Sequence, residues 1–174
     1  NKLKKNQELQ IVTRLNELDI LVDETISITR KISQELRPSI LDNLGLTSAL
    51  EWLQNQYSTR SNLKFSFNKP NKELKINNDY AITIFRITQE ALTNIIRHAD
   101  ASKVIVDLKI KNENIQLNIQ DDGKGINMND EIERPKFGIL GMKERAASLG
   151  GKLDVISNKK NGTSINVLLP RVLN

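Results

Sequence analysis

Residues 115–126 place the strongest constraint on how this chain can fold. Residues 115–120 alternate between apolar and polar side chains, Ile-Gln-Leu-Asn-Ile-Gln, which predicts a strand. The strand delivers Asp121 into a loop with glycines at 123 and 125, where the backbone can approach a ligand closely. A buried carboxylate at this place can accept hydrogen bonds from a flat ligand that carries donors. A second glycine pair, Gly138 and Gly141, opens the next predicted helix, and the two loops together predict a nucleotide pocket.

The order of the predicted elements favours an α+β fold. We expect helices over about 6–36, 42–58, 79–97 and 138–149, strands over about 63–67, 103–110, 114–120, 152–157 and 164–169, and a polar loop over 127–137. Helix caps are predicted at Asp42 or Asn43 and at Asn78, and Gly150 with Gly151 is expected to stop the last helix. Because strands and helices do not alternate strictly, we predict a sandwich in which three helices cover one face of a mixed sheet, not a doubly wound sheet.

The segment over 6–36 contains neither glycine nor proline and carries a heptad pattern. Its apolar positions recur in steps of four and three, with two threonine interruptions: Ile11, Leu15, Leu18, Val22, Thr25, Thr29, Ile32 and Leu36. A helix cannot bury such a stripe alone, so we expect partner helices. The alternative is that the stripe packs only within its own chain. Since the residue before Pro38 disfavours the helical conformation, the helix is expected to end there, and we predict two domains, 1–41 and 42–174.

Composition excludes several function classes. A chain of 174 residues can hold one domain, or a small domain with an extra helical piece. The absence of cysteine excludes disulfides, thiolate metal sites and cysteine nucleophiles, and it fits a cytoplasmic location. No apolar run is long enough to span a bilayer, so any membrane anchor is expected outside this sequence. The net charge of +5 comes from scattered lysines with few aromatic residues between them, which favours a mildly basic surface over a nucleic-acid interface.

Glu90 and Asn94 are the candidate metal ligands. Their spacing of four places them on one helix face, and a carboxylate with an amide oxygen can hold Mg²⁺, or its waters, against phosphate oxygens. Arg97 lies three residues further on and can face the same phosphates. Two of these signals also have a plainer interpretation. Glu90 and Asn94 are also consistent with a solvent-facing polar stripe, and Asp121 is also consistent with an ordinary Asp-x-Gly turn. The GxxxxGK[ST] pattern does not occur, which excludes a P-loop, and the GxGxxG pattern does not occur either.

Four motifs, taken in order, resemble the N, G1, G2 and G3 boxes of the Bergerat-type (GHKL) ATP-binding fold. They are Glu90, Asn94, Arg97 and His98, then Asp121, Gly123 and Gly125, then Gly138, Gly141 and Met142, then Gly162 and Thr163. That fold is shared by sensor histidine kinases, gyrase-type topoisomerases, mismatch-repair ATPases and heat-shock chaperones. Residues 36–46, 85–94 and 138–145 look most like the histidine-kinase subfamily that includes nitrate and membrane-fluidity sensors. The resemblance covers nearly the whole chain. The helix expected over 6–36 resembles the second dimerisation helix, and residues 1–5 resemble the tail of the first.

The resemblance implies a role for each box. Asp121 would accept a hydrogen bond from the adenine amino group, and an acceptor there favours adenine over guanine. Asn94 would coordinate Mg²⁺ with Glu90 close by, and these two are the candidate catalytic residues. The resemblance implies ten further residues at the ATP site: Arg97, His98, Gly123, Gly125, Ile126, Gly138, Leu140, Gly141, Met142 and Thr163. Residues 127–137 would form the ATP lid.

His98 is the only histidine in the sequence, and it lies inside an ATP-site box. The resembled kinases transfer the γ-phosphoryl group to a histidine that is followed by an acidic residue on the first dimerisation helix, and no such pair occurs in this sequence. We therefore expect the acceptor histidine upstream of this sequence, in a homodimeric protein that passes the phosphoryl group to a response regulator. The alternatives are a hydrolase or serine kinase on the same fold, or a non-catalytic dimerisation module with a vestigial pocket.

Overall fold

The computed structural model of the chain describes Arg14, Leu18, Val22 and residues 39–59, 61, 63–70, 74, 76–111, 113–126, 137–158 and 162–171. Backbone contacts divide the chain into two units, Asn1–Pro38 and Ser39–Asn174. In the first unit the three described residues are helical, and Leu18 and Val22 of the predicted heptad stripe are 57% and 51% exposed. The rest of the helix predicted over 6–36 lies outside the described residues. None of the helices in the described ranges is long and apolar enough to cross a membrane.

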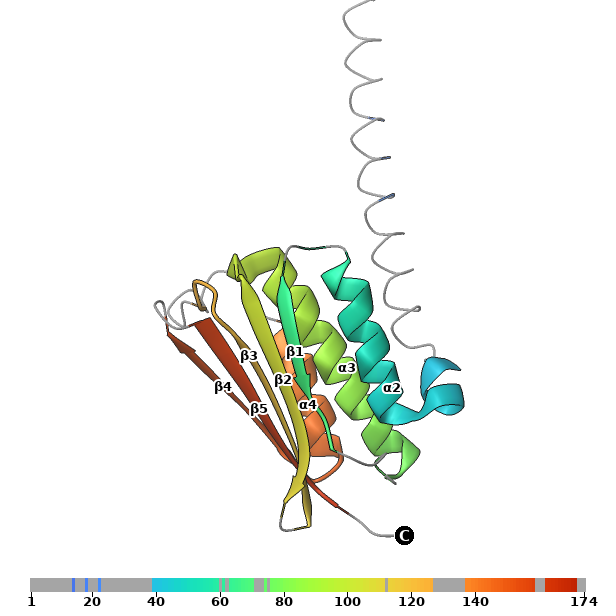
Figure 1. Cartoon of the computed structure of the whole chain (residues 1–174). Helices are drawn as coiled ribbons and strands as arrows, with labels where there is room; N and C mark the ends of the chain where they lie inside the picture. Colours follow the sequence, from blue (N-terminus) through green and yellow to red (C-terminus); the bar gives the residue numbers. More distant parts are fainter. Residues whose placement is uncertain are drawn as a thin grey trace, which may run out of the picture. The chain divides into compact units, whose positions relative to one another are not determined.

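The second unit is a two-layer α+β sandwich (Figure 1). Its elements are α2 (Ser39–Ser58), β1 (Lys64–Asn68), α3 (Asn78–Asn94), the π-helical turn η1 (Ile95–Ala99), β2 (Lys103–Lys111), β3 (Asn114–Asp121), α4 (Phe137–Ser148), β4 (Lys152–Asn158) and β5 (Gly162–Pro170). The strands form one sheet in the order β1-β2-β3-β5-β4. Only the β1–β2 pair is parallel, and α3 with η1 makes the crossover that a parallel pair requires. The predicted mixed sheet with three covering helices is confirmed.

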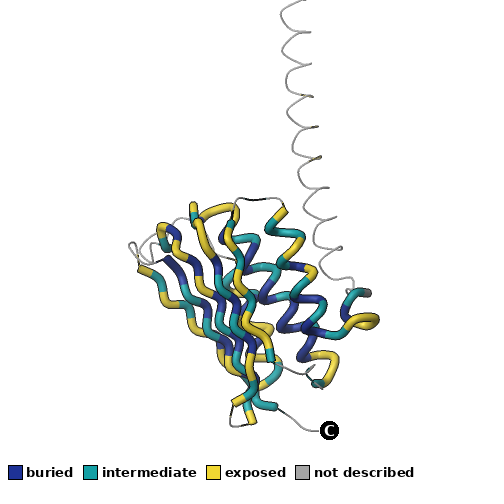
Figure 2. The backbone as a smooth tube through the Cα atoms, in the orientation of Figure 1, coloured by how far each residue is buried: buried dark blue, intermediate teal, exposed yellow. Residues whose placement is uncertain are grey.

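The core lies between the three helices and one face of the sheet. Side chains alternate along each central strand, so that Ile115, Leu117 and Ile119 of β3 are buried while the residues between them are not (Figure 2). Ile84, Ile87 and other apolar residues of α3 cover this face. The opposite face of the sheet is mostly polar, although it also carries the exposed apolar residues Ile156 and Leu168. Asn118 on that face donates hydrogen bonds to Ser164 Oγ at 2.9 Å and to Asn166 Oδ1 at 2.8 Å.

Three helix boundaries differ from the predicted ones. Helix α2 begins at Ser39, directly after Pro38, and is interrupted at Gly45, which has φ 76° and ψ 174°. Helix α3 is capped by the Asn77 side chain, which accepts from the Asp79 amide at 3.0 Å, so the cap lies one residue before the predicted Asn78. The α-helix stops at Asn94, and the residues up to Ala99 form a π turn. A π turn contains more residues per turn than an α-helix. The Arg97 side chain therefore does not lie over the Asn94 side chain as it would in an α-helix, where residues three apart share a face.

Candidate functional site

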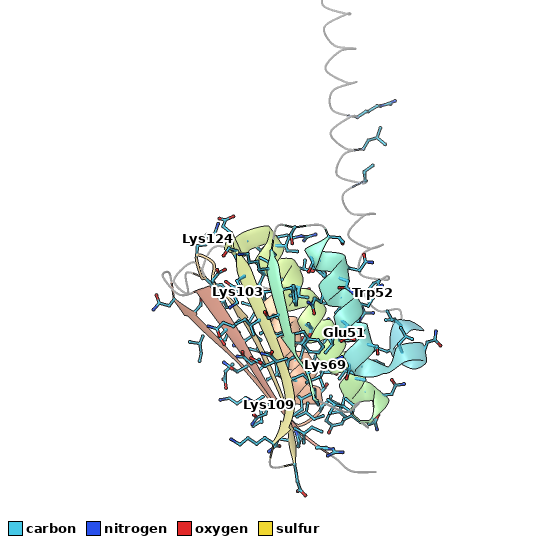
Figure 3. All side chains as sticks on the ribbon, viewed as in Figure 1. Glu51, Trp52, Lys69, Lys103, Lys109 and Lys124 are labelled. Carbon is cyan, nitrogen blue, oxygen red and sulfur yellow. The ribbon has the colours of Figure 1, made fainter. Side chains whose placement is uncertain are left out.

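Paired residues of neighbouring strands form rows across the face of the sheet that meets the helices, and the last of these rows is polar. The rows across β2, β3, β5 and β4 are aliphatic over most of this face, for example Val106, Ile119, Ile165 and Val155. In the last row, Val104 pairs with Asp121, Thr163 lies next along the sheet, and Ser157 pairs with Thr163. Lys103 and Lys124 mark this end of the sheet, and Lys109 lies toward the opposite end (Figure 3). We call Asp121, Thr163 and Ser157 the polar row.

Asp121 is the most constrained member of the polar row. Its side chain is only 4% exposed, and its Oδ1 accepts the backbone amides of Gly123 at 2.8 Å and Thr163 at 3.3 Å. Burial raises the pKa of the Asp121 carboxyl, and the two amide hydrogen bonds oppose that rise. Both hydrogen bonds from described residues end on Oδ1, which leaves Oδ2 to accept from a ligand donor.

The loop after Asp121 is fixed by a second carboxylate that sequence reasoning missed. Asp122 accepts the amides of Ser102 and Lys103 at 2.8 Å each and the Ser102 hydroxyl at 2.6 Å. The Ser102 hydroxyl is the largest cause of the lowered pKa of Asp122. Gly123 is buried against Ala99, and the Lys124 amide donates to the Ala99 carbonyl at 2.8 Å. The Asp121 loop is thereby fastened to the end of η1 and to the start of β2.

A hydroxyl joins the far end of the same loop to the polar row. Ser157 Oγ accepts the Ile126 amide at 2.6 Å and lies 3.1 Å from Thr163 Oγ1. Gly125 packs against Ser157 and Asn158. Sequence reasoning missed Ser157, although its alternation with Leu153 and Val155 places it on the buried face of β4.

Glu90 and Asn94 meet the first turn of α4. Asn94 Nδ2 donates to Glu90 Oε1 at 3.3 Å, so the two side chains share one face of α3 as predicted. Gly138 packs against both: a Cβ at this position would lie 2.2 Å from Glu90 Oε1 and 3.3 Å from Asn94 Nδ2. Because the amide nitrogen of Asn94 donates to Glu90, its side-chain oxygen is not used in this hydrogen bond. Among the described residues, no group of three His, Cys, Asp or Glu side chains gathers as a metal site.

The other predicted residues that the structure describes differ in their burial and in their contacts. Arg97 and His98 are exposed side chains of η1, and neither makes a hydrogen bond or ion pair with the other predicted site residues that the structure describes. Leu140 is 53% exposed, whereas Met142 is fully buried in the core. Gly141 lies beneath the Arg145 side chain. The predicted loop over 127–137 lies outside the described residues except for Phe137, which is 73% exposed.

Comparison with known proteins identifies this arrangement. Residues 79–173 match the family described as histidine kinase-, DNA gyrase B- and HSP90-like ATPase. The sensor histidine kinase LiaS of Bacillus subtilis is 34% identical over 95% of this chain and 45% of its own length. The oxygen sensor histidine kinase NreB of Staphylococcus carnosus is 27% identical over 92% of this chain and 46% of its own length. The chain thus spans about half the length of these relatives.

The fold agrees with a solved histidine kinase. The structure of AdeS from Acinetobacter baumannii superposes with a TM-score of 0.67, covering 90% of this chain and 84% of that one, at 14% identity. The family match includes every predicted site residue, from Glu90 to Thr163, and it implies ATP binding. The chain therefore belongs to the histidine kinase-, DNA gyrase B- and HSP90-like ATPase family, and it is similar to the sensor histidine kinases LiaS and NreB.

Proposed function

We propose that Asp121 reads the adenine of ATP and that the Glu90–Asn94 pair holds the metal-bound phosphate end. The observation that carries the proposal is the buried Asp121 carboxylate, whose Oδ1 is held by two backbone amides while Oδ2 remains for the ligand. An amino donor of the base would satisfy that oxygen, whereas the carbonyl of guanine would leave it without a partner. In the alternative of a vestigial pocket, Asp121 would serve only to bind the two backbone amides through Oδ1, and the chain would not bind ATP.

The residues present also fit Mg²⁺ that arrives with the nucleotide. Mg²⁺ keeps several waters and is commonly held by one or two protein oxygens together with substrate phosphates. Asn94 Oδ1 and the Glu90 carboxylate, both beside Gly138, supply such a small ligand set. Bound Mg²⁺ would neutralise charge on the phosphates, and Arg97 would add a second positive charge from η1.

We propose that the phosphoryl acceptor is a histidine outside these 174 residues, on a partner helix of the region 1–41. The complete protein would then be a homodimer that passes the group to a response regulator, with 42–174 as its catalytic domain and 127–137 as the ATP lid. LiaS and NreB, both named as sensor histidine kinases, support this assignment. His98, the only histidine of the sequence, is assigned to the nucleotide side of the site.

A labelling experiment tests the acceptor assignment. We expect the chain to bind Mg-ATP in calorimetry but to remain unlabelled after incubation with γ-labelled ATP, because the only imidazole in the sequence belongs to the ATP site. Adding the separate acceptor helix region of the same protein should produce label on that region alone. Stable label on the chain itself, lost in His98→Gln, would contradict the assignment. Absence of any ATP binding would contradict the proposed function as a whole.

ATP binding should also weaken on acidification. Burial raises the pKa of Asp121, so its carboxylate becomes the neutral acid at a higher pH than an ordinary aspartate, which titrates near ~3.9. Binding that needs the charged acceptor is complete well above that pKa and is lost as the pH falls through it. For folding the sign is opposite, since protonating a group with a raised pKa favours the folded state. Carbon-13 NMR of the aspartate side chains, assigned with Asp121→Asn, would give the pKa. Constant ATP affinity through that pH would contradict the prediction.

A further inference from the structure

We propose that Ser157 is a positioning residue that sets the direction of the Thr163 hydroxyl at the adenine end of the site. This inference rests on the proposed function of the polar row and extends it to a residue on another strand. Ser157 and Thr163 are registered partners on β4 and β5, and their hydroxyl oxygens lie 3.1 Å apart. Thr163 is 8% exposed and donates its amide to Asp121 Oδ1 at 3.3 Å. Ser157 therefore contacts the residue that itself holds the adenine-reading carboxylate.

Either hydroxyl could donate in the Ser157–Thr163 hydrogen bond, and we assign the two protons from the neighbouring groups. Ser157 Oγ accepts the Ile126 amide at 2.6 Å, so its own proton has two nearby acceptors, Thr163 Oγ1 at 3.1 Å and the Gly162 carbonyl at 3.3 Å. The shorter contact favours donation to Thr163. Thr163 Oγ1 then acts as acceptor toward Ser157, and its own proton is directed to another group. Toward a bound ligand, the Thr163 hydroxyl is therefore a hydrogen-bond donor.

A donor beside an acceptor matches the edge of adenine. The adenine edge presents an amino donor next to a ring nitrogen that accepts, and the guanine edge presents the reverse, a carbonyl next to a ring N–H. Asp121 Oδ2 meets the amino group, and the Thr163 hydroxyl, directly or through a water, meets the ring nitrogen. Without Ser157 the Thr163 hydroxyl can rotate and accept equally well, so it no longer opposes guanine. Ser157 thereby contributes to the choice between ATP and GTP without touching the base.

The same hydroxyl also fixes the loop that follows Asp121. The Ile126 amide is the last described group before residues 127–136, and its hydrogen bond to Ser157 ties it to β4. Ser164 offers a contrast on the neighbouring strand, because its hydroxyl lies on the open face and accepts from Asn118. Substitution of Ser164 therefore removes a sheet hydroxyl without affecting the polar row.

The test compares Ser157→Ala, Ser157→Thr and Ser164→Ala in the full 174-residue chain. Affinities for ATP and, by competition, for GTP are measured together with melting temperatures. We expect Ser157→Ala to weaken ATP binding about tenfold, the loss of roughly one hydrogen bond, while GTP binding stays constant or tightens, so the ATP/GTP ratio falls at least as much. Ser157→Thr, which keeps the hydroxyl, should restore most of the ratio, and Ser164→Ala should leave it unchanged.

The outcomes separate this inference from the proposed function. An unchanged ratio in Ser157→Ala, or equal losses for ATP and GTP, would overturn the positioning role, because a merely structural serine lowers both affinities alike. If Ser157→Ala fails to fold, Ser157→Cys, which is similar in size but a weak hydrogen-bonding partner, gives the same comparison. Failure of the wild-type chain to bind ATP would overturn the proposed function instead.

Discussion

Asp121→Asn is expected to weaken ATP binding about a hundredfold, equivalent to roughly 2.7 kcal/mol. The substitution keeps the size of the side chain but replaces one carboxylate oxygen with an NH₂ donor. The two backbone amides that bind Oδ1 require an acceptor, so the remaining oxygen stays with Gly123 and Thr163. The new NH₂ group then faces the amino group of adenine, and two donors meet in a buried position. Calorimetric titration with Mg-ATP would measure the loss.

A matched substitution separates this effect from a general loss of charge. Asp154→Asn makes the same chemical change on the exposed face of β4, where the carboxylate forms an ion pair with Lys152 at 2.9 Å. It should leave ATP affinity within about twofold, since an exposed ion pair contributes little. Equal affinities for wild type and Asp121→Asn would show that Asp121 does not read the base. GTP binding should suffer less in Asp121→Asn, because the amide donor suits the guanine carbonyl.

The sheet was predictable because its hydrophobic pattern is local. Residues 103–110 and 114–120 were predicted as strands and are β2 and β3 within two residues, since each has one face against the helices and one in solvent. The break at Gly45 was not predicted. It depends on how Ile40 and Leu41 reach the core from one side of the break and Leu46 from the other, which is a tertiary requirement. The π turn at the end of α3 was not predicted either, and its last residue, Ala99, packs against Gly123, which lies far away in the sequence.

Some residues of the candidate site were also predictable from sequence, and others were not. Asp121, Glu90 and Asn94 were named from sequence because their residue types and spacing suggest chemistry directly. Asp122 and Ser157 were missed because each acts through a partner far away in the sequence, 19 or 20 residues for Asp122 and 31 for the Ser157–Ile126 bond. A polar residue in phase with buried apolar ones on an edge strand was the available signal for Ser157.

Gly162→Ala is expected to lower the free energy of unfolding more than a methyl group added at any other glycine of the described site. Gly162 has φ +74°, and a Cβ there would lie 2.1 Å from the Asp121 carbonyl oxygen and 2.8 Å from Asp121 Oδ1. We expect a loss of about 2–5 kcal/mol in the free energy of unfolding, from left-handed backbone strain together with overpacking. ATP affinity should fall at least tenfold, since misplacing a positioned group by about 1 Å can cost ~100-fold. Denaturant unfolding and ATP titration measure the two effects.

Gly150→Ala is the matched control, because it has nearly the same backbone conformation in different surroundings. Gly150 has φ +70°, and its nearest neighbour would be Pro170 Cγ at 3.7 Å, an ordinary contact. Gly150→Ala should lower the free energy of unfolding only by the backbone strain, about 1–2 kcal/mol, and should keep its ATP affinity. The difference between the two variants isolates the cost of pushing β5 away from Asp121, because the strain is common to both. Equal unfolding free energies and equal ATP affinities in the two variants would mean that the close contact between Gly162 and Asp121 does not hold the carboxylate in place, and the geometric basis for its role in reading adenine would be lost with it.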